Sequence, residues 1–238
     1  MALDNLAFEA IKNLLIQSLT VPENLEDVAA YVKNLISKPM MGNQNSTKKL
    51  EIDYELVKAF DKASSVIKNN MSSFYPISNR CGAISSGFAA LSQAITGTTR
   101  LEYHLIMRVF LYFCENKDEM VDLMQKLIHR FPNMVISFED EVKKCFMKNA
   151  NYLTWYALSR MLRCTINIWV VYYNESKGSL DIRLNKVPPP QMNTFEKIDI
   201  LELIDGPSKN YRLLKAKKPP GPEALLGDDN TSQKVSCT

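Results

Sequence analysis

The chain has 238 residues, of which 46% are hydrophobic and 23% are charged, an ordinary balance for a globular protein. Its 29 basic and 26 acidic residues leave a net charge of +3. This charge is too balanced to indicate binding to nucleic acid or to a membrane surface. The length is enough to bury the core of one domain and to carry an appendage.

Cofactor chemistry finds little support in the sequence. The cysteines are scattered and form no C-x-x-C pair, so neither a disulfide framework nor a zinc site is predicted. No phosphate-binding glycine loop and no paired histidines are present, and we expect no cofactor and no metal. No signal peptide is visible, and no apolar run is long enough to span a bilayer. We therefore expect an intracellular protein, cytoplasmic or nuclear, with reduced thiols.

Two helices are predicted near the N-terminus, over residues 4–19 and 25–36, with a break at Pro22. We predict that residues 1–45 form a helical extension that packs on the main domain, because both apolar faces need burying. The alternative is an extension that binds a partner. The predicted apolar faces consist of Leu6, Ala10, Ile11, Leu14, Leu15 and Leu19 in the first helix, and Val28, Tyr31, Val32 and Leu35 in the second.

The central stretch, residues 81–115, predicts two buried helices. Ser85 or Ser86 can cap the first by accepting a hydrogen bond from a free backbone N–H. Gly97 can end it in a left-handed conformation. The second helix is apolar almost all round, which is typical of a helix inside a core. A single helix over residues 53–69 and an extended segment over residues 74–77 come before this stretch.

The remaining pattern predicts helices followed by strands. Helices are expected over residues 119–131, 138–149 and 150–162. Residues 166–173 are β-branched and aromatic on both faces, which indicates a strand in the middle of a covered sheet. A hairpin return over 179–184 and strands over 198–203 and 210–214 follow. Residues 215–238 are rich in Lys, Pro, Gly and Asp, and we predict a disordered tail.

These segments together resemble the ovarian-tumour (OTU) family of cysteine deubiquitinases over residues 74–214. In that family a loop reading roughly D-G-N-C-L-F-R-A-L-S places the nucleophile at the start of the central helix, followed by an H-L-x-x-R helix. A W…A-L-A-x-x-L…I-x-V-Y segment and a closing H-Y-x-x-L come later. The residues that carry the resemblance are Phe88, Ala90, Leu91, Ser92, Thr96, Gly97, Thr98, His104, Leu105, Arg108, residues 155–162, residues 166–172, and residues 210–214.

The sequence departs from the family pattern at the positions of the catalytic residues. Ser86 stands at the nucleophile position and Asn210 at the closing histidine position. A serine hydroxyl needs a positioned general base even more than a cysteine thiol does, and an amide cannot take a proton. The histidines of the chain, His104 and His129, fall in predicted helices far along the chain from residue 210. We therefore predict that the chain is not an enzyme.

The resemblance implies an α+β, papain-like OTU-type fold, with a small mixed sheet flanked by helices over residues 46–214. Our first hypothesis is a pseudo-deubiquitinase that acts as a protein-binding or scaffold module, with ubiquitin or a ubiquitin-like protein as the candidate partner. Its binding residues would be Ser85, Ser86, Gly87, Asn210 and Tyr211. The alternative is an interaction platform in a larger assembly with no ubiquitin binding. A weaker alternative is a hydrolase that uses Ser86.

Overall fold

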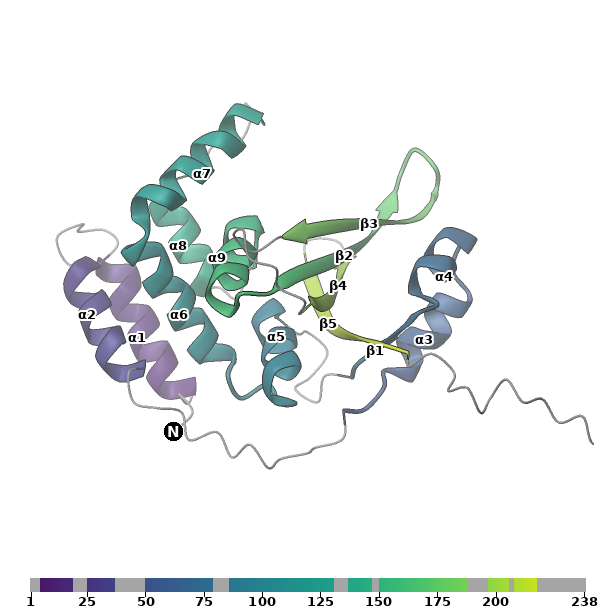
Figure 1. The fold of residues 1–238 in the computed structure, drawn as a ribbon, viewed down its shortest axis with the longest axis horizontal. Coiled ribbons are helices and arrows are strands. Elements are labelled where there is room, and N and C mark those ends of the chain that lie inside the picture. Colours follow the sequence, from purple (N-terminus) through teal and green to yellow (C-terminus); the bar gives the residue numbers. More distant parts are fainter. Residues whose placement is uncertain are drawn as a thin grey trace, which may run out of the picture.

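The structure is a computed structural model that describes residues 5–18, 25–36, 50–78, 86–130, 137–146, 150–187, 197–205 and 208–217. Within these residues nine helices surround one five-stranded mixed sheet (Figure 1). The predicted α+β class is therefore confirmed. None of the helices in these ranges is long and apolar enough to cross a membrane.

The sheet has the strand order β1-β5-β4-β2-β3. Its central pair, β2 (Thr165–Asn174) and β4 (Lys197–Asp205), is parallel, and every other neighbouring pair is antiparallel. The first and last strands of the chain, β1 (Phe74–Pro76) and β5 (Ser208–Ala216), pair with each other. The strand β3 (Ser179–Val187) forms the other edge. As predicted, β2 is an internal strand with both faces covered.

Helices cover the two faces of the sheet unequally. On one face the helices α5 (Gly87–Thr96), α6 (Glu102–Glu115) and α9 (Tyr152–Leu162) build the main hydrophobic core. On the other face α3 (Tyr54–Asp61) and α4 (Ser65–Met71) cover a smaller cluster. Figure 1 shows α3 and α4 standing apart from the larger group of helices. Because strand residues alternate between faces, Tyr211 and Leu214 of β5 belong to different clusters.

The two central helices form as the sequence predicts. Ser86 caps α5, and Gly97 ends it with a left-handed φ of 72°. Seven consecutive residues of α5, Gly87 to Gln93, are buried. The helix α6 buries side chains around most of its circumference, including Leu105, Ile106 and Phe110. These two helices therefore lie inside the domain.

The N-terminal helices α1 (Asn5–Ser18) and α2 (Leu25–Ile36) contribute to the main core, and α2 packs on α6. The predicted packing is confirmed, but the predicted faces are partly wrong. Phe8 is fully buried, whereas Leu14 is 51% exposed and Tyr31 is 50% exposed. Phe8 stacks on Tyr103 of α6 at 4.4 Å between ring centroids, and this contact sets which face of α1 turns inward.

Two other elements differ from prediction. Residues 53–69 form two helices and not one, because the Ser64 hydroxyl caps a new helix, α4, at Ile67 N. The strand β5 continues through Ala216, two residues into the predicted tail, because β1 supplies a pairing partner there. The rest of that tail, residues 218–238, lies outside the described residues, as do residues 37–49. The remaining helices are α7 (Lys117–Arg130) and α8 (Phe138–Phe146).

Candidate functional site

Ser86 stands at the position of the family nucleophile, and its hydroxyl takes part in hydrogen bonds at two helix starts. Its hydroxyl oxygen accepts a hydrogen bond from the backbone N–H of Ala89 at 3.1 Å, which caps α5. The same hydroxyl donates to Oε1 of Glu102, the first residue of α6, at 2.5 Å. The serine therefore ties the start of α5 to the start of α6. Ser85, the neighbouring predicted binding residue, lies outside the described residues.

Gly87 is buried beneath α9. A Cβ atom at this position would come within 2.6 Å of Cζ2 of Trp155 and 3.1 Å of Cβ of Ala150. The absence of a side chain thus lets the N-terminus of α5 lie directly against the start of α9. The indole ring of Trp155 thus covers Gly87, which the sequence predicts as a binding residue.

Tyr211 is also part of the core, at 1% exposure. Its ring lies 5.9 Å from that of Trp155, and its hydroxyl donates to the carbonyl oxygen of Ala150 at 3.1 Å. Burial, together with the nearby carboxylate of Glu202, raises the pKa of Tyr211. Glu202 in turn pairs with Lys209 at 2.8 Å. Tyr211, which the sequence predicts as a binding residue, therefore positions the start of α9 from within the core.

Asn210 takes part in a different set of contacts. Its Oδ1 accepts a hydrogen bond from Nη1 of Arg212 at 2.6 Å. Nε of Arg212 donates to Asp53 at 3.1 Å, and the other oxygen of Asp53 caps α3 at Leu56 N. Residues 210 and 212 share one face of β5, and residue 211 has the opposite face. The contact with Asp53 places Asn210 toward α3, whereas Tyr211 points toward Trp155.

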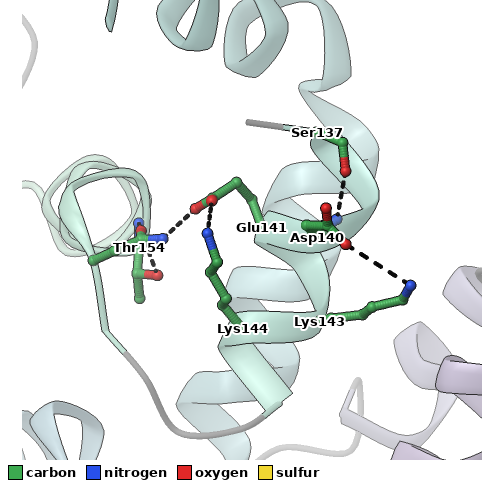
Figure 2. A network of polar contacts seen from close by, with 7 residues as sticks. Ser137, Asp140, Glu141, Lys143, Lys144 and Thr154 are labelled. Atoms are coloured by element: carbon green, nitrogen blue, oxygen red, sulfur yellow. Dashed lines mark hydrogen bonds and ion pairs between the residues drawn. The ribbon is translucent and has the colours of Figure 1, made fainter. Parts of the chain in front are cut away.

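A buried carboxylate fixes the start of α9, and sequence reasoning missed it. Glu141 of α8 is 3% exposed and accepts hydrogen bonds from Asn151 and from Lys144, the latter at 2.6 Å. Asn151 in turn accepts from the backbone N–H of Thr154 at 3.0 Å and so caps α9. Figure 2 shows Glu141 between Lys144 and the α9 cap. Through this chain, α8 holds Trp155 over Gly87.

The histidines of the chain are engaged elsewhere or exposed. Nε2 of His104 accepts a hydrogen bond from Arg108 at 3.3 Å, and burial together with the Arg108 charge lowers the pKa of His104. His129 lies in the exposed last turn of α7. The groups that contact Ser86 and Asn210 in these hydrogen bonds are a carboxylate, a backbone N–H and a guanidinium. Among the described residues no cluster of side chains is arranged to hold a metal ion.

The N-termini of two helices, α5 and α9, meet at this site. The positive ends of the α5 and α9 dipoles lie close together, where Gly87 meets Ala150. This field favours a negatively charged group nearby. Tyr152, the first residue of α9, is 43% exposed beside this junction and presents an aromatic side chain to solvent. Ser86 and Asn151 already accept hydrogen bonds from backbone N–H groups at these two helix starts.

Comparisons with known proteins give a weak likeness. No protein-family model matches the chain, and no curated protein matches it. A solved structure of the OTU domain of OTUD1 is similar, with a TM-score of 0.41 and 13% sequence identity. The alignment covers 68% of this chain and 94% of that one. A likeness at this level says nothing about activity or partners.

Proposed function

We propose that this chain is a catalytically inactive, OTU-like module that binds a protein partner, with ubiquitin as the first candidate. The sequence motifs over residues 74–214 suggest the family, and Ser86 and Asn210 stand where its nucleophile and histidine are expected. The observation that carries the proposal is the engagement of the Ser86 hydroxyl by Ala89 N and by Glu102.

This engagement suits a structural serine. A nucleophilic hydroxyl needs a base that takes its proton as the bond to substrate forms, and that base is usually an imidazole. Glu102 is a carboxylate, which is a much weaker base than an imidazole. Its hydrogen bond with Ser86 joins the starts of α5 and α6, 16 positions apart in sequence. These two hydrogen bonds of the Ser86 hydroxyl thus serve helix ends.

Inactivity is tested with a fluorogenic ubiquitin derivative that reports cleavage at its C-terminus. We expect no turnover by the natural chain. The double variant Ser86→Cys, Asn210→His should also stay inactive, because Asn210 is bound to Arg212 on the α3 side of β5. Turnover by the natural chain that is lost in Ser86→Ala would show that the chain is a hydrolase instead.

Ubiquitin binding is tested by NMR titration of isotope-labelled ubiquitin with the chain. A substitution at Gly87 would not probe the proposed ubiquitin-binding surface, because any side chain there collides with Trp155. Tyr152→Ala is the sharper variant, and Tyr31→Ala is its matched control, since both tyrosines are about half exposed. We expect localised shifts that Tyr152→Ala reduces and Tyr31→Ala leaves unchanged. A flat spectrum at high concentration would rule out ubiquitin as the partner.

One observation favours the second candidate, an interaction platform without ubiquitin binding. The N-terminal helices keep Leu14 and Tyr31 in solvent although both helices contribute to the main core. A partner seated on these helices would cover both side chains. Such a platform predicts that Tyr31→Ala weakens capture of the partner while Tyr152→Ala does not, which is the opposite of the ubiquitin result.

A further inference from the structure

The strand β3 is a long edge of the sheet. It pairs with β2 from Ser179 to Val187, and within the described residues no strand pairs with its other side. In Figure 1 β3 lies at the outer margin of the sheet. The chain next reaches β4 from the same end of the sheet, because Val187 pairs with Ile166 and Lys197 pairs with Thr165.

One backbone donor on this edge is covered by its own neighbour. The N–H of Ile182 donates to Oδ1 of Asp181 at 2.9 Å. The donor therefore points away from β2, and a side chain takes the place that a further strand would fill. Natural sheets guard exposed edges with charged side chains in this way. In an antiparallel strand the outward groups recur at every second residue, so Leu180 and Leu184 also present theirs outward.

The side chains of β3 divide by face. Leu180, Ile182 and Leu184 share the face that α3 and α4 cover, and Leu180 is 46% exposed. Asp181 and Arg183 lie on the opposite face. The strand thus carries an apolar stripe on one face and an acidic and a basic residue two positions apart on the other.

We propose that β3 pairs antiparallel with β3 of a second copy of this chain, with the two-fold axis at Ile182. In this register Ile182 lies opposite Ile182 of the second copy. Leu180 lies opposite Leu184 of the second copy, and Asp181 lies opposite its Arg183. The sheets of the two copies then become continuous. The Oδ2 atom of Asp181 already contacts Lys177 at 2.9 Å and Asn174 at 3.3 Å within the same chain, and its Oδ1 atom turns from the Ile182 N–H to a guanidinium.

Charge selects this register over its neighbours. In such a pair, directly opposite residues share a face, so the axis must pass through a residue. An axis at residue 181 sets Asp181 against itself, and an axis at residue 183 sets Arg183 against itself. Like charges directly opposite destabilise a pair of strands, and opposite charges stabilise it. The axis at Ile182 alone among these three gives two acid–base pairs and aligns the apolar stripes.

The test is sedimentation velocity of the full chain over a concentration series from micromolar to millimolar. We expect a monomer–dimer equilibrium. Arg183→Glu sets Glu against Asp181 at two symmetric places, and it should weaken the dimer roughly tenfold. Asp181→Arg should weaken it similarly. Lys186→Glu makes the same charge change as Arg183→Glu on the same strand, opposite Gly178 in this register, and should leave the dimer unchanged.

Mixing the two weakened variants is the decisive step. In a mixed dimer, Asp181 of one copy faces Arg183 of the other, and the introduced Glu faces the introduced Arg. The mixture should therefore dimerise about as well as the natural chain, although each variant alone does not. A natural chain that stays monomeric throughout the series would overturn the proposal. A dimer that Arg183→Glu does not weaken, or that mixing does not restore, would overturn it as well.

Discussion

Two helices, α5 and α7, are held in the molecule by different forces. The helix α5 has seven consecutive buried residues and lies between the sheet and the other helices. The helix α7 is longer, at 14 residues, yet only Met120 and Met124 of its side chains are buried. In Figure 1 the far end of α7 projects away from the body of the molecule. Packing secures α5. The helix α7 also packs on the core, through partly buried Val121, Leu123 and Leu127, but it has a second, polar attachment.

The polar attachment is a cluster around Glu119, at the start of α7. Its carboxylate accepts hydrogen bonds from Tyr112 of α6 at 2.9 Å and from Tyr156 of α9 at 2.8 Å, and also from Arg160 of α9. Burial alone would raise the pKa of Glu119, but the hydrogen bonds from Arg160, Tyr156 and Tyr112 outweigh it and lower that pKa. The helices α6, α7 and α9 thus meet at the carboxylate of Glu119. The strength of this contact depends on pH, whereas the packing around α5 does not depend on pH.

The largest effect is expected from removing the ring that covers α5. Trp155→Ala deletes a side chain that is 2% exposed and lies against Gly87 and Tyr211. Truncating a buried tryptophan costs about 3–5 kcal/mol of unfolding free energy. Urea denaturation measures it, with the exposed Tyr152→Ala as a control that should change little. A cost similar to that of the control would mean that α5 is not held by packing.

A smaller and more local effect is expected at Glu119. Glu119→Gln weakens the hydrogen bonds from Arg160 and the two tyrosines, and we expect a loss of about 1–2 kcal/mol. Hydrogen exchange should accelerate in α7 and stay slow in α5, since the contacts of α5 are untouched. Asp118→Asn, one residue away and exposed, is the matched control. Equal acceleration in both helices would show that they unfold as one unit.

The smallest effect is the pH dependence of the same contact. The pKa of Glu119 is lower in the folded chain than in the unfolded chain, so its contribution is complete above the unfolded value. As the pH falls below that value and then through the folded pKa, the contribution is lost. Stability of the natural chain should therefore decline on acidification more steeply than that of Glu119→Gln. Parallel declines in thermal melts across this range would contradict the assignment.

The elements around α5 could be predicted because their signals are local. Ser86 and Gly97 mark the two ends of a helix by capping chemistry that depends on a few neighbouring residues. The break between α3 and α4 was missed because apolar residues keep helical spacing across it, and the Ser64 cap alone marks it. The inward face of α1 was misjudged because Phe8 has a stacking partner in α6 that no local pattern reveals.

For the candidate site, the sequence could indicate which residues to consider but not which groups they contact. Ser86 and Asn210 were identified from motif order, but their contacts depend on elements far away in sequence. Glu102 lies one helix beyond Ser86, and Arg212 of β5 reaches Asp53 across 159 positions. The burial of Gly87 depends on how α9 sits on α5, which is set by the Glu141 contact with the α9 cap. Such placements arise from tertiary packing, which periodicity does not encode.

The pairing of β1 with β5 has a consequence for synthesis. Because Phe74 pairs with Ala216, β1 can form its pairing with β5 only after nearly the whole domain has been synthesised. Until residues 208–216 leave the ribosome, β4 also lacks one neighbouring strand. Pairing over such a separation in sequence is slow, because a long loop must close first. Until then the edges of β1 and β4 that β5 will pair stay open, and the need of the nascent chain for chaperones should be greatest just before β5 appears.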